Sequence, residues 1–427
     1  EFIFSSPTGE TFEYLAGLYY QDEELNHVRV TDVQLSAADI GNGNLDASGG
    51  GTFQHEASTL SAFVQGTFNV SDSFRLITGV RYSRDEKEFS KDGVVTDYLG
   101  TTPNQGLAGI YDALLNFSTD HFFANGVATR CPGITYNCVS EAFDTKRDES
   151  NVTGDVTLQW DASDDTMVYF KIGNGYKAFG FDEANGRGQF DAQAYEEESV
   201  VSYEIGSKMD LLDGRARLNM AVFFSEFEDV QVSTFDGNAG FVVGNAAESE
   251  VYGLEVDGSI VLTEQLTLNA AFAYLDASYK SFADAACNEL QAVAWIAGGG
   301  ARATCVQDLS GAPLQFSPEF SGNIALDFLT PVSDSMELRI NLDAMYSDEY
   351  QVAADQDAVL AQGSFIKVNA RIQLASSNDT WSLALLAKNI TDERYRIGVV
   401  AVADSSGTYN QAWGEPRMFG LDLRQLF

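Results

Sequence analysis

The feature that most constrains this chain is a repeated alternation of apolar and polar residues. In the stretch 336–346 every even position is apolar, and most odd positions are charged or polar. The stretches 216–224, 320–328 and 366–374 show the same period of two. Successive side chains of a β-strand point to opposite faces of the sheet, so each stretch predicts a strand with one apolar and one polar face. The chain is therefore predicted to be all-β.

Helices are predicted to play a small part. A membrane-spanning helix needs about 20 consecutive apolar residues, and the sequence has no such stretch. The nearest candidate, Leu290–Ala297, is too short and predicts a helical turn inside a loop. A second short helix is predicted within 107–117, where apolar residues have helical spacing.

The alternation alone also fits a soluble β-sandwich or propeller, and two further features favour a barrel in a membrane. Aromatic residues recur near predicted strand ends, where the two membrane interfaces attract them. Examples are Tyr20, Trp160, Tyr274, Tyr346 and Trp381. Short and long connections also alternate along the chain. The long connections are predicted near 36–51, 90–150, 178–196, 283–317, 351–363 and 403–413.

Short periplasmic turns and long extracellular loops are typical of outer-membrane barrels. The pattern therefore predicts a transmembrane antiparallel up-and-down β-barrel in a bacterial outer membrane. About 15 strands are counted in this chain, and Phe427 is placed at the periplasmic side. Single-chain bacterial barrels have even strand numbers, so the odd count predicts further strands before the first one. Charges on the second face of the strands, such as Asp343, Arg371 and Asp422, predict salt bridges and hydrogen bonds inside the barrel.

The charge and the cysteines exclude some classes of partner. A net charge of −38 at pH 7 argues against nucleic acid, because phosphate binding needs clustered Lys and Arg. The four Cys form two close pairs in polar segments, Cys131 with Cys138 and Cys287 with Cys305. This placement predicts two disulfides in an oxidising compartment. Zinc is the alternative, but no His lies beside a Cys pair, so no metal site is predicted.

An ordered series of short segments runs through the chain. It comprises Tyr203–Lys208, Leu211–Arg215, Phe223–Gln231, Gly244–Ala247, Gly253–Val256, Ser317–Glu319 and Lys388–Tyr395. The series resembles the TonB-dependent receptors of bacterial outer membranes, in order and spacing, across essentially the whole chain. The resemblance implies a barrel of about 22 strands around a plug. About seven strands, the plug and the segment that engages TonB would then lie N-terminal to this sequence.

The resemblance also implies a function. Receptors of this family take up scarce solutes by active transport, most commonly ferric siderophores. Energy would arrive from the TonB–ExbB–ExbD complex through the N-terminal region. Outer-membrane lipid, lipopolysaccharide and the barrel assembly machinery are the other implied partners, and no cofactor is implied. The alternative class is a passive porin-like or adhesin-like barrel.

Ligand contacts are expected from residues near the extracellular mouth. Aromatic rings hold flat or apolar ligand surfaces, and Arg pairs with carboxylates. The candidates are Tyr176, Phe179, Phe181, Arg187, Phe235, Phe241, Tyr409 and Trp413. The alternative for these residues is packing within loops and interface girdles.

The C-terminal strand carries a further candidate signal. Phe419, Leu421 and Leu423 share one face, and the chain stops at Phe427. This ending resembles the signal by which outer-membrane proteins are recognised for assembly.

The sequence matches no catalytic motif considered for it. The segment His55–Thr59 lacks the second His of a zinc-protease helix, and no Gly-x-Ser-x-Gly nucleophile turn occurs. The chain is predicted not to be an enzyme.

Overall fold

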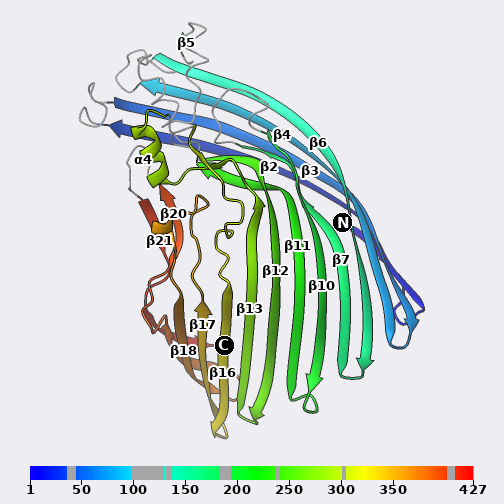
Figure 1. Cartoon of the computed structure of the whole chain (residues 1–427). Coiled ribbons are helices and arrows are strands. Elements are labelled where there is room, and N and C mark those ends of the chain that lie inside the picture. Colours follow the sequence, from blue (N-terminus) through cyan, green and yellow to red (C-terminus); the bar gives the residue numbers. More distant parts are fainter. Residues whose placement is uncertain are drawn as a thin grey trace.

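The computed structural model of the chain describes residues 1–35, 45–97, 129–130, 137–182, 194–235, 241–300, 304–401 and 409–426. One antiparallel sheet dominates these residues, and its strands are neighbours in chain order (Figure 1). They are β1 (Phe2–Ser5), β2 (Phe12–Leu35), β3 (Leu45–Ser71), β4 (Phe74–Asp97), β6 (Asn137–Ser163), β7 (Thr166–Lys177), β10 (Glu198–Leu211), β11 (Ala216–Phe235), β12 (Phe241–Thr263), β13 (Leu266–Ser281), β16 (Phe320–Ser333), β17 (Met336–Ser347), β18 (Phe365–Ser376), β19 (Trp381–Lys388) and β22 (Met418–Gln425).

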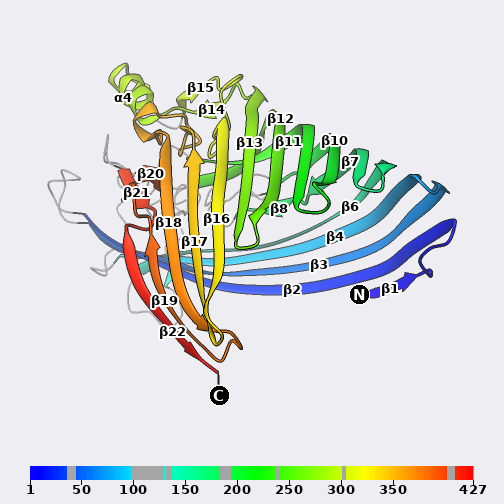
Figure 2. The same ribbon diagram turned by 90° about the horizontal axis from the view of Figure 1, so that it is seen from below.

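These fifteen successive strands of the described residues match the number that the alternation predicted. The sheet is strongly curved, and β1 and β22 form its two edges in the described part of the chain (Figures 1 and 2). Every pair of neighbours is antiparallel, and every second pair is joined by a short turn at one end of the sheet. The all-β fold class is confirmed.

Short elements fill the other end of the sheet. β5 (Thr129–Arg130) pairs with β6, β8 (Gly180–Phe181) with β9 (Ala194–Tyr195), β14 (Ala285–Ala286) with β15 (Val306–Gln307), and β20 (Arg396–Ala401) with β21 (Tyr409–Trp413). The helix α4 (Glu289–Ala297) confirms the predicted helical turn, and a 3₁₀ turn, η4, covers Ala358–Leu360. The helix predicted within 107–117 lies outside the described residues.

The two faces of the sheet differ in polarity. One face carries exposed apolar side chains, among them Leu18, Val64, Val80, Val156, Val222, Ile324 and Leu385. The other face carries the predicted polar ladder. The Asn219 amide donates to Asp257 at 2.9 Å, and the Arg371 guanidinium lies 3.0 Å from the Asp422 carboxylate. Alternation along paired strands therefore separates an apolar outer face from a hydrogen-bonded inner face.

Aromatic side chains mark both margins of the apolar face. Near the short turns, the rings of Phe74 and Trp160 stack with centroids 6.3 Å apart. Toward the other end, the Tyr82 hydroxyl donates to the Ser150 hydroxyl at 2.9 Å. Residues 74–82 thus span the band in nine residues, close to the about 9–11 residues of a tilted membrane strand. The aromatic girdles expected from the sequence fall at these margins.

Beyond the tyrosine margin the outer face becomes charged. Arg84 lies 3.0 Å from Asp148, and Lys146 lies 2.7 Å from Glu86, on the same face that is apolar further down. Strands β4 and β6 continue through this region, well into the range 90–150 that was expected to be a long connection. Where both faces of the sheet contact water, the strands no longer need apolar residues at alternate positions, although their backbone hydrogen bonds continue. The alternation in the sequence therefore ends before the strands do.

The turn after β10 illustrates the short connections. Leu212, Asp213 and Gly214 all have positive φ, at 57°, 57° and 79°. Asp and Gly tolerate this left-handed backbone, so the Asp-Gly pair allows β10 to reverse tightly into β11.

Candidate functional site

The predicted ligand residues lie at the end of the sheet that carries the long connections, and they fall into two separate groups. Phe179 and Phe181 follow β7, whereas Tyr409 and Trp413 belong to the β20–β21 hairpin. Arg187 lies outside the described residues. Phe235 and Phe241 face each other as backbone partners where β11 meets β12. The structure thus does not gather these candidates into one pocket.

The first group forms an aromatic cluster with two cations. Phe179 is fully buried, with its ring edge-on to Phe181 at 6.2 Å. The Lys87 ammonium lies 5.2 Å and the Arg147 guanidinium 5.0 Å from the centre of the Phe179 ring. Phe181 stacks on Phe89 at 5.8 Å. The ring of Phe179 therefore packs inside the protein, and the cations on β4 and β6 hold it there.

Tyr176 joins the same region through a hydrogen bond. Its hydroxyl donates to the Asp85 carboxylate at 2.7 Å, across the width of β6. No sequence pattern pointed to Asp85, Lys87 or Arg147, because they lie in strands remote from the predicted aromatic residues. Their contacts tie the segment after β7 to the inner face of β4 and β6.

On its other side, this segment is clamped by two amides of β11 and β12. The Asn245 amide donates to the carbonyls of Glu196 and Asp229 at 2.9 and 2.8 Å, and its oxygen accepts from the Glu196 backbone N–H at 2.6 Å. Gln231 donates to the carbonyls of Ala178 and Glu196 at 3.1 and 2.9 Å. Asn245 belongs to the Gly244–Ala247 segment, so the resemblance had marked it without assigning it a role.

An ion pair completes the clamp. The Arg147 guanidinium donates to the Glu196 carboxylate at 3.0 Å. The hydrogen bonds from Arg147 hold the pKa of Glu196 below its usual value, so the carboxylate is charged at neutral pH. Together, these contacts hold Ala178 and Glu196, at the two described ends of the 178–196 segment, against β6, β11 and β12.

The second group also has its own network. The Tyr409 hydroxyl donates to the buried Asp357 carboxylate at 2.6 Å. Burial, followed by this hydrogen bond, raises the pKa of Tyr409, so it remains a neutral donor. Trp413 is 49% exposed, and the Arg396 guanidinium lies 5.5 Å from the centre of its ring. Trp413 is therefore available to a ligand, whereas Phe179 is not.

Cys287 and Cys305 form a disulfide with their Cα atoms 5.5 Å apart, as the sequence predicted. The bond closes the loop that contains α4. Asn288 caps that helix reciprocally with Gln291, each side chain accepting from the other's backbone N–H at 3.0 Å. The second predicted pair cannot be placed, since Cys131 lies outside the described residues.

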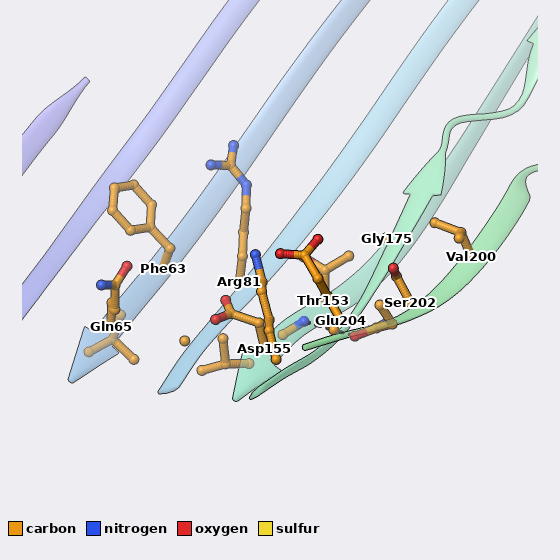
Figure 3. Close-up of a pocket in the computed structure, with 16 residues that line it drawn as sticks. Phe63, Gln65, Arg81, Thr153, Asp155, Gly175, Val200, Ser202 and Glu204 are labelled. Carbon is orange, nitrogen blue, oxygen red and sulfur yellow. Dashed lines mark hydrogen bonds between the residues drawn. The ribbon is translucent and has the colours of Figure 1, made fainter. Parts of the chain in front are cut away.

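A hollow of about 470 Å³ lies on the inner face of β3, β4, β6, β7 and β10 (Figure 3). Glycines such as Gly79 and Gly173 have no side chain, so only backbone forms the floor of the hollow at these positions. Arg81, Asp155 and Glu204 project from the surrounding strands, so the wall offers both signs of charge. A wall of this kind suits contact with a polar, close-fitting surface rather than with a small apolar molecule.

The described residues contain neither a membrane-spanning helix nor a cluster of metal ligands. No helix in this part of the chain is long and apolar enough to cross a membrane. No group of three or more His, Cys, Asp or Glu side chains in it has a geometry that could hold a metal ion. Phe419, Leu421 and Leu423, the residues of the predicted assembly signal, are exposed on the outer face of β22, and Phe427 lies outside the described range.

Two curated receptors resemble parts of the chain in sequence. The metal-pseudopaline receptor CntO of Pseudomonas aeruginosa is 36% identical over 104 residues, which are 24% of this chain and 14% of CntO. The pesticin receptor of Yersinia enterocolitica is 25% identical over 202 residues, 47% of this chain and 23% of that receptor. The chain therefore matches less than a quarter of the length of these curated relatives.

Solved structures show the same fold at low identity. The ferric yersiniabactin uptake receptor FyuA from Yersinia pestis superposes with a TM-score of 0.63 and 14% identity, covering 99% of this chain and 56% of FyuA. The siderophore receptor PiuA from Acinetobacter baumannii gives a TM-score of 0.58 and 15% identity, covering 96% of this chain and 55% of PiuA. The chain thus spans about half the length of either structure.

The family match is more extensive. The family model described as "TonB dependent receptor-like, beta-barrel" matches residues 3–390, most of the chain. Members of this family are receptors and transporters of the outer membrane rather than enzymes. The girdled apolar face and the polar inner face agree with that location. The chain belongs to the TonB-dependent receptor β-barrel family.

Proposed function

We propose that this chain forms the barrel of an outer-membrane receptor that takes up a scarce solute by TonB-dependent active transport, and that the solute is a metal chelate such as a ferric siderophore. The family match over residues 3–390 carries the proposal. The metal-pseudopaline receptor and the ferric yersiniabactin receptor among the related proteins support the choice of a metal chelate.

The geometry at the end of the sheet with the long connections fits a receptor. The segment around Phe179 and Phe181 is held across the inner side of the mouth by contacts to β4, β6, β11 and β12. Trp413 and Arg396 on the β20–β21 hairpin present an exposed ring and a cation near the same end. Rigid segments that bear aromatic rings at a barrel mouth position ligand contacts without closing the lumen.

The proposal includes the partners of the family. Energy comes from the TonB–ExbB–ExbD complex, insertion depends on the barrel assembly machinery, and lipopolysaccharide surrounds the outer end of the apolar band. The proposal assigns the assembly signal to Phe419, Leu421 and Leu423, which are exposed on β22.

Uptake of radioactive iron tests the function. The complete gene is deleted in the source bacterium, and cells are supplied with ferric chelates isolated from its own iron-limited culture medium. We expect uptake to fall on deletion, to return on complementation, and to stop when tonB is deleted or the proton gradient is collapsed. Uptake that persists without TonB would instead favour a passive porin-like barrel.

The proposed topology makes a separate prediction. An epitope inserted between Ser310 and Gly311, at the end with the long connections, should bind antibody on intact cells. An epitope between Asp164 and Asp165, in a short turn, should bind only after the outer membrane is permeabilised. The reverse pattern would place the C-terminus outside the cell, contrary to the proposal.

A further inference from the structure

The hollow on the inner face of β3, β4, β6, β7 and β10 contains charged side chains of both signs. Its volume of about 470 Å³ falls within the about 300–1,000 Å³ typical of small-molecule sites. All five strands are described over their whole length. The hollow faces the inside of the proposed barrel, where a solute would pass.

Arg81 is a cation that the wall fixes in place without giving it an acidic partner. Its guanidinium donates to the hydroxyls of Ser61 and Ser83 at 2.9 and 3.2 Å, and these two buried hydroxyls lie 2.9 Å apart. The centres of the Tyr19 and Phe63 rings lie 5.3 and 5.6 Å from it. Within the described part of the chain, Arg81 makes no ion pair. The guanidinium therefore keeps donors for a carboxylate, in a position that needs little ordering on binding.

Asp155 is the corresponding acid. It lies between Gly79 on β4 and Gly173 on β7, which are its two cross-strand partners. A Cβ atom on Gly79 would lie 3.1 Å from the Asp155 carboxylate, and a Cβ atom on Gly173 would lie 3.2 Å from the Asp155 Cβ. The two glycines therefore leave room beside the carboxylate. Among the described residues, none donates a hydrogen bond to this carboxylate or forms an ion pair with it.

A second charge of each sign lines the same hollow. Lys171 on β7 and Glu204 on β10 are cross-strand partners. The Tyr169 hydroxyl donates to the Glu204 carboxylate, whereas Lys171 makes neither a hydrogen bond nor an ion pair with the described residues. Figure 3 shows Arg81, Asp155 and Glu204 projecting from the same side of their strands. Two cations thus balance two carboxylates in this part of the wall.

We propose that the hollow binds an amino-carboxylate group, with its carboxylate on Arg81 and its ammonium on Asp155. A group with negative charge alone would meet Asp155 and Glu204, and a group with positive charge alone would meet Arg81 and Lys171. A zwitterion instead gains charge-assisted hydrogen bonds at both ends and leaves the balance of charge unchanged. The inference names a chemical class for part of the solute, and its role in uptake rests on the proposed receptor function.

Four dansyl probes that differ only in charge test the site. Nε-dansyl-lysine carries an ammonium and a carboxylate; dansylcadaverine lacks the carboxylate, dansyl-6-aminohexanoate lacks the ammonium, and N-pentyl dansylamide lacks both. The protein is expressed from its complete gene and placed in nanodiscs of zwitterionic phosphatidylcholine. Probe fluorescence is then titrated, and empty nanodiscs correct for probe dissolved in lipid. We expect Nε-dansyl-lysine to bind about tenfold more tightly than either singly charged probe, and the uncharged probe to bind least.

Variants assign the binding to this hollow. Arg81→Gln should weaken Nε-dansyl-lysine about tenfold without weakening dansylcadaverine, which has no carboxylate to lose a partner. Asp155→Asn should weaken Nε-dansyl-lysine about tenfold without weakening dansyl-6-aminohexanoate. Arg371→Gln and Asp343→Asn are the matched controls, since both side chains bond to inner-face partners outside the hollow, and they should change binding little. Thr153→Trp fills the hollow without changing its charge and should abolish binding.

Two outcomes would overturn the inference. One is Nε-dansyl-lysine that binds the unchanged protein no more tightly than a singly charged probe. The other is Nε-dansyl-lysine binding that survives Thr153→Trp, or both charge-removing variants, in protein whose heat-modifiable band shows that it is folded. Binding is measured without transport, so the amino-carboxylate site can fail while TonB-dependent iron uptake stands. Equally, uptake can prove independent of TonB while the amino-carboxylate site stands.

Discussion

Asn389 is a single residue on which a strand exit depends. It is 1% exposed and has a left-handed backbone with φ of 48°. Its amide donates to the carbonyls of Glu393 and Glu415 at 2.9 and 3.0 Å, and its oxygen accepts from the Glu393 N–H at 3.0 Å. These bonds join the end of β19 to the segment just before β22.

Asn389→Ala should therefore destabilise the barrel. The variant leaves buried backbone groups without partners and places Ala at a positive φ, which together should cost about 2–4 kcal/mol. The measurement is the midpoint of heat unfolding in detergent, followed by the shift of the folded band on a gel. Asn378→Ala, in an exposed turn, should change the midpoint little. Equal effects of the two variants would show that burial of the Asn389 amide contributes nothing.

Among the elements, the segment between β7 and β10 depends on its clamp. Asn245→Ala removes the acceptor of the Glu196 N–H and the donor to two carbonyls. Hydrogen exchange followed by mass spectrometry should show faster exchange in peptides covering Glu196, since that amide loses its partner. Asn269→Ala is the control, because Asn269 bonds Asp327 on the inner wall. If Asn245→Ala leaves exchange at Glu196 unchanged, the segment is held by Gln231 and Arg147 alone.

The elements also show how far sequence reasoning reaches. Period-two alternation predicted strands wherever one face meets lipid, and it predicted the short turns between them. It failed beyond the tyrosine margin, where Arg84 and Glu86 face water and the strand continues without an apolar face. It also could not separate Phe179, which is buried against Lys87 and Arg147, from Trp413, which is exposed. Those contacts join strands that are far apart in sequence, so a local sequence pattern does not predict them.

At the scale of the whole molecule, the two faces of the sheet have opposite requirements. Two consecutive residues of strand β16 show both requirements. Ile324 is exposed on the outer face, midway between Phe320 and Phe328, whereas Asn323 lines a polar hollow on the inner face. In lipid, a lysine at the middle of the outer face has no water and no partner. On the inner face, the same lysine meets a hollow that also contains Asp257.

Ile324→Lys should consequently impair the barrel where Asn323→Lys does not. A lysine on the lipid face at mid-membrane costs about 2–4 kcal/mol, and the cost falls toward either interface. Both variants are expressed from the complete gene, and the heat-modifiable fraction in purified outer membranes is compared with that of the unchanged protein. We expect a clear loss for Ile324→Lys and a nearly normal fraction for Asn323→Lys. The opposite order would mean that the polar face, not the apolar one, is turned to lipid, and the reading of the sheet as a membrane barrel wall would then be wrong.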